Sequence, residues 1–167
     1  ECGAGAHTFT EVSGFTRNPW NTALAAAGSS GGSAVALATG MAWLATGSDL
    51  GGSLRNPASF CSIVGLRPSQ GRIPSDPGEI AFNRLSMEGP MARNVHDAAM
   101  LLDIMAGYDS RDPMSLDNPT VSFEKTAAEQ RVPPRIAFSP DLGVTPVDPE
   151  VAEICERAAL RCEELGA

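Results

Sequence analysis

The sequence has few basic residues, histidines and aromatics. Lys125 is the only lysine among twelve basic residues, and twenty acidic residues bring the formal net charge to −8 at pH 7. Such a surface binds phosphate backbones poorly, so we expect no direct nucleic-acid partner. The longest apolar run, residues 34–45, is interrupted by Thr39 and Gly40. It is shorter than a bilayer span, so we expect no membrane-spanning helix.

Cysteines are also few, at positions 2, 61, 155 and 162, and none belongs to a CxxC pair. Neither histidine, His7 or His96, stands at metal-ligand spacing from a cysteine. We therefore expect neither a metal site nor a disulfide framework. Small buried thiols are typical of a reducing compartment, which favours the cytoplasm.

Three common site types match the sequence poorly. The glycines at 28, 31 and 32 lack the lysine of a Walker loop and the spacing of a dinucleotide fingerprint. A Ser-His-Asp triad needs a histidine in a suitable context, and we interpret both histidines as surface imidazoles. We expect no nucleophile elbow of the α/β-hydrolase type. We expect no cofactor.

The apolar pattern predicts alternating helices and strands. A chain of 167 residues with 43% apolar residues is long enough for one globular core. We expect helices over 33–41, around 57–61, over 94–106 and from 149 to 165. Strands are expected over 42–46 and 135–139, with one more possible strand in the N-terminal loop of residues 1–27. We expect 65–82 to be irregular and 109–132 to be a polar surface excursion. This alternation predicts an α/β fold.

Two glycine-serine turns, over 28–33 and 48–55, bracket the helix and strand predicted at 33–46. Glycine tolerates backbone dihedrals that let several N–H groups converge on one point. Convergent N–H groups stabilise an oxyanion, and a serine at the end of such a turn is placed to attack the carbon that bears it. The turns therefore predict acyl-transfer chemistry.

Longer motifs surround these turns: GSSGG at 28–32, GSDLGGSLRNPA at 47–58, FC at 60–61, VGLRPS-x-GR at 64–72 and EGPMAR at 88–93. In this order they resemble the amidase-signature family over most of the chain. The resemblance implies a layered α/β/α fold with a mixed β-sheet, of which only the central part is present. We accordingly expect residues 1–167 to be a single partial domain, truncated at both ends.

The resemblance also implies a Ser-Ser-Lys triad. Ser53 matches the nucleophile, and Ser29 matches the bridging serine, which follows a cis peptide bond in the family. The lysine of the family lies farther upstream of the bridging serine than the 28 residues available here. Lys125 matches no motif of the family, and we interpret it as a solvated surface lysine.

The family's oxyanion hole matches the backbone N–H groups of Leu50, Gly51, Gly52 and Ser53. The resemblance also implies a supporting set around the two serines, in which Asp49 and Arg55 hold the turn through an ion pair or a hydrogen-bond network: Gly28, Ser30, Ser48, Asp49 and Arg55. Two positions depart from the family pattern. Ala27 stands where glycine is usual, and its methyl group either crowds the turn or is tolerated; Ser48 stands where threonine is common.

We therefore expect an amide hydrolase that acts through an acyl-enzyme on Ser53, with a small-molecule amide as substrate. Because the lysine is missing, we expect the chain alone to be nearly inactive. Two alternatives stay open: the amidase subunit of a tRNA-dependent amidotransferase, and a non-catalytic remnant of the fold. The 65–90 segment resembles the general amidases more closely. Unpaired strand edges in a central piece predict self-association or a homo-oligomer.

Overall fold

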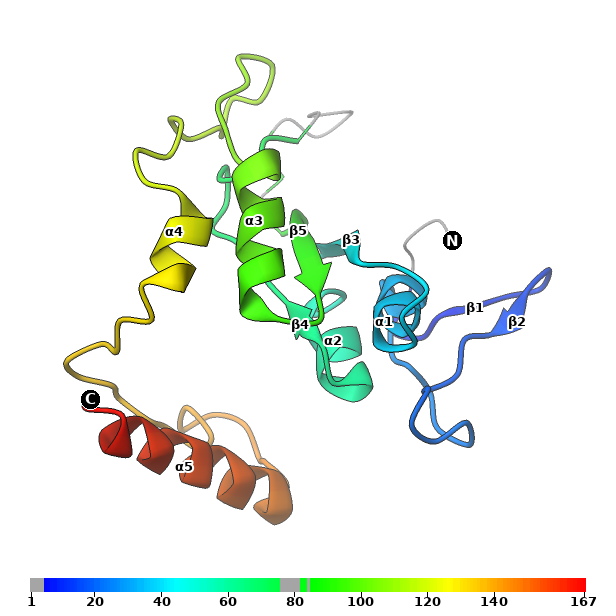
Figure 1. Ribbon diagram of the computed structural model, residues 1–167. Helices are drawn as coiled ribbons and strands as arrows, with labels where there is room; N and C mark the ends of the chain where they lie inside the picture. The colour runs from blue at the N-terminus through cyan, green and yellow to red at the C-terminus, as the bar shows by residue number, and fades with distance from the viewer. Residues whose placement is uncertain (1–4, 76–81, 84) are drawn as a thin grey trace. The chain divides into compact units, whose positions relative to one another are not determined.

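The computed structural model describes residues 5–75, 82–83 and 85–167 (Figure 1). The chain forms two compact units, Glu1–Ala128 and Glu129–Ala167. The single partial domain expected over the whole chain stays a prediction. The first unit contains the elements in this order: β1 (Phe9–Thr10), β2 (Gly14–Phe15), α1 (Gly31–Ala38), β3 (Leu44–Asp49), α2 (Arg55–Cys61), β4 (Val64–Gly65), β5 (Met87–Ala92), α3 (Val95–Met105) and α4 (Phe123–Ala128).

The main sheet has the strand order β3-β5-β4, and both of its pairings are antiparallel. The register between β3 and β5 runs from Leu44 opposite Ala92 to Asp49 opposite Met87. Strands β1 and β2 form a separate antiparallel pair. Within the described residues, β3 and β4 are the edge strands of the main sheet and β5 lies between them. The sequence predicted a strand over 42–46, and β3 covers Leu44–Asp49.

Strand β5 was not predicted, because Gly89 and Pro90 are residues that weaken strands. The Pro90 carbonyl accepts a hydrogen bond from the Leu66 N–H at 3.1 Å, so this residue bonds toward β4. The backbone nitrogen and oxygen of one strand residue point to the same side. The missing N–H of proline therefore faces the short β4, and the longer ladder with β3 loses no bond.

Helices enclose the main sheet. α1 and α2 cover one face and share a buried cluster with β5 (Ala26, Ala34, Leu37, Leu54, Ala58, Cys61 and Met91). Because side chains alternate along a strand, Pro90 and Ala92 face the other side. There α3 packs against β5 (Figure 1), and its Ala98, Ala99 and Leu102 are buried. This layering confirms the α/β fold class that the resemblance implies.

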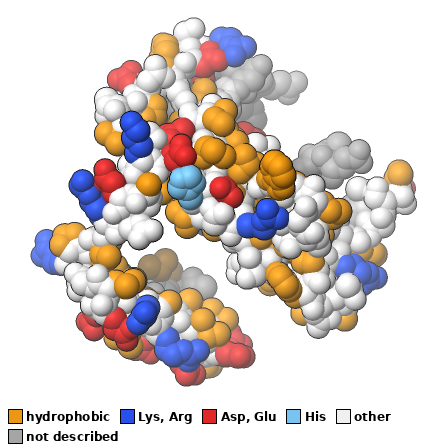
Figure 2. Space-filling view, viewed as in Figure 1, with side chains coloured by type: hydrophobic (Ala, Val, Ile, Leu, Met, Phe, Trp, Pro, Cys, Tyr) orange, Lys and Arg blue, Asp and Glu red, His pale blue; other side chains and the backbone are white. Residues whose placement is uncertain are grey.

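Side-chain caps explain why the longer helices were predictable. At the start of α3, the Asn94 side chain accepts a hydrogen bond from the Asp97 N–H at 2.8 Å. In the second unit, α5 (Pro149–Glu164) begins after Asp148, whose carboxylate accepts from the Glu150 N–H at 2.9 Å. Charged side chains gather on α5 (Figure 2), and ion pairs link Arg157 to Glu153 and Arg161 to Glu164.

The prediction of a strand over 135–139 was wrong, although the composition of this segment is apolar enough for one. Helix α4 was not predicted, and it lies inside the polar surface excursion expected over 109–132. The Ser122 hydroxyl caps it by accepting a hydrogen bond from the Lys125 N–H at 3.2 Å, and α3 supplies a second cap. The Asp103 carboxylate accepts from the Phe123 N–H at 2.8 Å and from the Glu124 N–H at 3.0 Å. The cap from Asp103 is distant in sequence, whereas the cap from Ser122 is a local signal that sequence reasoning missed.

Some predictions fall outside the described residues, namely residues 1–4 with Cys2, and 76–81 of the segment expected to be irregular. No helix in the described part of the chain is long and apolar enough to cross a membrane.

Candidate active site

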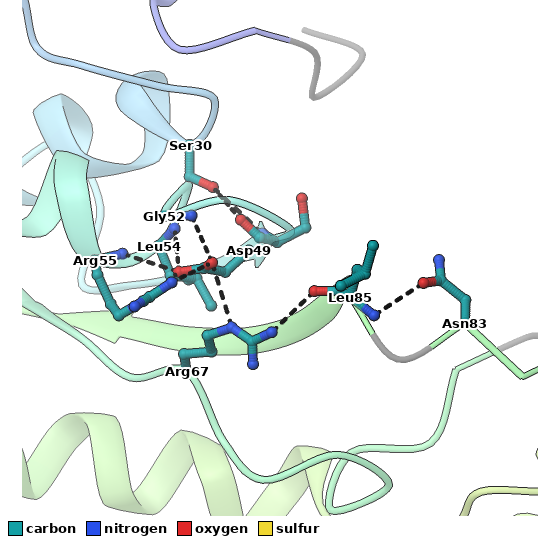
Figure 3. Close-up of polar contacts among 9 residues, drawn as sticks. Ser30, Asp49, Gly52, Leu54, Arg55, Arg67, Asn83 and Leu85 are labelled. Carbon is teal, nitrogen blue, oxygen red and sulfur yellow. Dashed lines mark hydrogen bonds and ion pairs between the residues drawn. The ribbon is translucent and has the colours of Figure 1, made fainter. Parts of the chain in front are cut away.

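A buried carboxylate organises the turn that carries Ser53. Strand β3 ends at Asp49, whose side chain is fully buried, and the chain then turns into α2. One oxygen of this carboxylate accepts from the Gly52 N–H at 2.7 Å, and the other accepts from the Leu54 N–H at 3.3 Å and the Arg55 N–H at 3.4 Å (Figure 3). Three backbone donors on both sides of Ser53 are thus held by one side chain.

Two arginines neutralise this carboxylate. Arg55 binds it through both ends of its guanidinium group, with Nε 2.9 Å from Oδ2 and Nη2 2.9 Å from Oδ1. Arg67 approaches Oδ1 with its Nε at 3.4 Å (Figure 3). The hydrogen bond from Arg55 and those from the backbone N–H groups hold the pKa of Asp49 well below its usual range, against the opposing effect of burial. Asp49 is therefore ionised at neutral pH and acts as a structural anion.

Arg67 is the member of this group that sequence reasoning missed. It was quoted only as a motif residue, because nothing local links it to position 49. Its Nη2 also donates to the Leu85 carbonyl at 2.9 Å (Figure 3), so it connects the turn to the segment that precedes β5. The contact between Arg67 and Asp49 depends on how the strands pair, so the local sequence does not indicate it.

The four N–H groups expected to form the oxyanion hole differ in their surroundings. The Gly52 N–H already bonds to Asp49. Within the described residues, the N–H groups of Leu50, Gly51 and Ser53 have no hydrogen-bond partner. Gly52 has a φ of +114°, and a Cβ placed on it would lie 2.6 Å from the Asn56 side chain, so only glycine fits there. The oxyanion hole stays a prediction, with three of its four donors available.

The first glycine-serine turn lies beside the second. The Gly28–Ser29 peptide bond is cis, as the resemblance implies. The Ser30 N–H donates to the Ser53 carbonyl at 3.2 Å. The Ser30 hydroxyl donates to the Ser48 carbonyl at 3.4 Å and accepts from the Ser48 N–H at 3.3 Å (Figure 3). Ser30 therefore ties the segment of Ser29 to both β3 and the segment of Ser53.

Ala27 is one of the two positions that depart from the family pattern, and its surroundings show how alanine fits there. It has a φ of +59°, in the left-handed region that glycine adopts most easily, and it is 4% exposed. Alanine is accommodated at this position, with its methyl group buried.

A small polar pocket of about 290 Å³ opens at the first turn. Its lining includes Ser29, Ser30, Ser48 and Thr8, and Glu88 is its one charged residue among those described. Partial desolvation by the surrounding protein raises the pKa of Glu88, although the residue is still exposed to solvent. Ser53 is half-buried and is not among the lining residues. The pocket is thus rich in hydroxyl groups, and no basic side chain of the described residues lines it.

Lys125 and His96 lie on α4 and α3, and neither lines this pocket. Lys125 is exposed on α4. His96 is about half exposed on the first turn of α3, with its Nε2 3.4 Å from a carboxylate oxygen of Glu124. In the part of the chain that the structure describes, no three His, Cys, Asp or Glu side chains are grouped to hold a metal ion.

Comparisons with known proteins agree with this geometry. The chain is 42% identical over its whole length to an acylamidase of Rhodococcus erythropolis, of which it covers 35%. It is 40% identical, again over its whole length, to a glutamyl-tRNA(Gln) amidotransferase subunit of Syntrophobacter fumaroxidans, of which it covers 34%. The chain thus spans about a third of the length of these relatives.

A solved structure is similarly close. The crystal structure of a bacterial aryl acylamidase of the amidase-signature family superposes with a TM-score of 0.92 at 38% identity, over 99% of this chain and 34% of that one. The profile of the Amidase family matches residues 1–167. The chain therefore belongs to the Amidase family of amidase-signature proteins.

Proposed function

We propose that the protein containing this chain is an amide hydrolase in which Ser53 forms an acyl-enzyme and Ser29 relays protons. One observation carries the proposal. Asp49 holds the Ser53 turn, in which the N–H groups of Leu50, Gly51 and Ser53 find no partner among the described residues. A backbone hydrogen bond of 3.2 Å joins that turn to the segment of Ser29. Available donors beside a serine are what a developing oxyanion needs.

The proposed reaction begins with proton transfer. A neutral lysine takes a proton from the Ser29 hydroxyl, which takes one from Ser53, and Ser53 Oγ bonds to the amide carbon. The carbonyl oxygen becomes an oxyanion at the N–H groups of the turn. Ser29 then donates a proton to the leaving nitrogen as the C–N bond breaks and the carbonyl re-forms, and the protonated lysine returns its proton to Ser29. Water gives one proton through Ser29 to the lysine as its oxygen bonds to the ester carbon. The acid leaves as the ester C–O bond breaks, and the proton held by the lysine returns through Ser29 to Ser53.

The lysine is implied by the family resemblance and has no counterpart among the described residues around Ser29. We therefore expect the isolated chain to react slowly, because an unaided serine hydroxyl is a weak nucleophile. Removing one oxyanion donor typically lowers kcat by about a hundred- to thousand-fold, and we expect loss of the base to lower it at least as much.

The proposed substrates are small-molecule amides. The superposition on an aryl acylamidase over 99% of the chain supports this class. The second candidate is the amidase subunit of a tRNA-dependent amidotransferase, supported by the relative that is 40% identical. That protein would act with partner subunits, without direct contact between this chain and nucleic acid. The third is a remnant that keeps the fold without the activity. Free thiols at Cys61, Cys155 and Cys162 support the cytoplasm as the proposed location.

The test is covalent labelling of the full-length protein with a fluorophosphonate, followed by peptide mapping. We expect the label on Ser53, none on the Ser53→Ala variant and normal labelling of Ser59→Ala, which alters an exposed serine of α2. Equal labelling of wild type and Ser53→Ala would refute the assignment of the nucleophile.

The same protein then separates the three candidates. Hydrolysis of simple aryl amides by the purified protein alone supports the general amidase. Activity that requires a co-purifying partner protein, with glutamine as ammonia donor, supports the amidotransferase. A folded protein that neither labels nor turns over either substrate supports the remnant.

A further inference from the structure

We infer that Thr8 is a positioning residue for Ser29, an inference that rests on the proposed function. Thr8 belongs to no motif that the sequence analysis used. Its hydroxyl donates to the Ala27 carbonyl at 3.0 Å, with the Ser29 carbonyl also within reach at 3.3 Å, and it accepts from the Gly31 N–H at 3.1 Å. All three partners are backbone groups within two residues of Ser29.

The backbone of residues 7–8 also packs closely against the turn that carries Ser29. A Cβ on Gly28 would lie 2.8 Å from the His7 carbonyl carbon, and a Cβ on Gly31 would lie 2.3 Å from the Thr8 hydroxyl oxygen. Glycines on both sides of Ser29 therefore let the 7–8 segment press against the turn. Thr8 is half-buried and lines the same polar pocket as Ser29.

Ser29 thus lies between two anchors. On one side, Ser30 ties the turn to Ser48 and to the Ser53 carbonyl. On the other side, Thr8 holds the backbone before and after Ser29. Because the Thr8 hydroxyl bonds to backbone groups, it does not take part in the proton relay, but it fixes where the Ser29 hydroxyl lies. Proton relay is sensitive to such placement, since a displacement of about 1 Å can lower a rate by about a hundredfold.

The test compares variants of the full-length protein with one amide substrate. Thr8→Val keeps the shape of the side chain and removes the hydroxyl, and we expect kcat to fall by about 10- to 100-fold while KM is unchanged. Thr8→Ser restores the hydroxyl and should restore most of kcat. The matched control is Thr10→Val, which removes the hydroxyl that caps the β1–β2 turn at the Ser13 N–H, and it should leave kcat at the wild-type value.

A double mutant separates positioning from general stability. If Thr8 acts through Ser29, adding Thr8→Val to Ser29→Ala should lower kcat no further than Ser29→Ala does alone. A full multiplicative loss in the double mutant would overturn the inference, as would a kcat for Thr8→Val equal to that of wild type. A rise in KM at constant kcat would also overturn it, because it would assign Thr8 to substrate binding.

Two controls complete the design. If Thr8→Val does not fold, Thr8→Ala and Thr8→Ser provide the same comparison, because both lack the γ-methyl group and differ in the hydroxyl. Fluorophosphonate labelling of wild-type Ser53 distinguishes failure of the proposed function from failure of the inference about Thr8. Absence of labelling refutes the proposed function, whereas normal labelling with unaffected Thr8 variants refutes only the role of Thr8.

Discussion

Replacing Asp49 with asparagine would remove the anion at the centre of the Ser53 turn. The side chain of Asp49 is 0% exposed, accepts hydrogen bonds from three backbone N–H groups and from Arg55, and forms an ion pair with Arg67. Asparagine keeps one acceptor oxygen, but its amide group would face the donors of Arg55 or Gly52. Breaking a buried ion pair by removing one partner costs about 3–5 kcal/mol, and the lower end applies because Arg55 is 57% exposed and is rehydrated by water.

We therefore expect Asp49→Asn to lower the free energy of unfolding of the full-length protein by about 3 kcal/mol. Urea unfolding with a constant m-value measures this loss. The matched control is Asp109→Asn, since the pKa of Asp109 is also lowered, to about 2, by Arg111, but this pair lies at the surface. The control should leave the urea midpoint unchanged. A loss below about 1 kcal/mol for Asp49→Asn, or an equal loss in the control, would refute the central role of this carboxylate.

The same variant has a defined pH dependence. Because the folded pKa of Asp49 is depressed, the stability that its charge contributes is fully present above the unfolded pKa of about 3.9 and is lost as the pH falls through the folded pKa. The difference in unfolding free energy between wild type and Asp49→Asn should thus be constant from pH 7 to 5 and shrink below about pH 4. A difference that grows on acidification would contradict the assignment.

Three further predictions concern the rest of the chain. Asn18→Ala should cost about 2 kcal/mol in urea unfolding, because the 6% exposed Asn18 side chain donates to the Phe60 carbonyl at 2.7 Å and accepts from the Trp20 N–H. Ala27→Gly should change the same quantity by less than about 1 kcal/mol, because relief of the left-handed backbone offsets the lost methyl group and the added freedom of the unfolded chain. The isolated 167-residue chain should self-associate in light scattering, because β3 is paired on one side only within the described residues and large hydrophobic side chains such as Trp43 are exposed; a strictly monomeric chain at high concentration would contradict this.

The sequence predicted the structural features that depend on local signals. Helices α3 and α5 begin after residues whose side chains cap the first turn, so the local sequence pattern was enough to locate them. The two glycine-serine turns were also predictable from local sequence, because glycine indicates backbone dihedral angles that other residues adopt only with strain. The resemblance added the cis bond at Gly28–Ser29, which no physical argument from composition could supply.

The features that the sequence did not predict depend on distant partners. Strand β5 contains Gly89 and Pro90, and it is tolerable only because the proline faces the short β4. Helix α4 has a local cap in Ser122, but Asp103 of α3 holds two further N–H groups of its first turn. Arg67 follows β4 and contacts Asp49, which ends β3, on the far side of β5 in the strand order. For β5 and for Arg67 the stabilising contact lies many residues away, and local propensity argues against the observed structure or is silent.

The contacts that place the two proposed catalytic serines all come from one part of the chain. Ser29 and Ser53 are each placed by contacts that arise within the first 67 residues: Thr8 and Ser30 hold one turn, while Asp49, Arg55 and Arg67 hold the other. The lysine that the family resemblance requires is not among those residues. In the proposed mechanism, the alignment of the two serines and the pKa of the base are therefore set by different residues. Substitutions at Thr8 or Asp49 should change the alignment of the hydroxyls without changing the pKa of the base, so they should lower the height of the pH–rate profile and leave its midpoint in place.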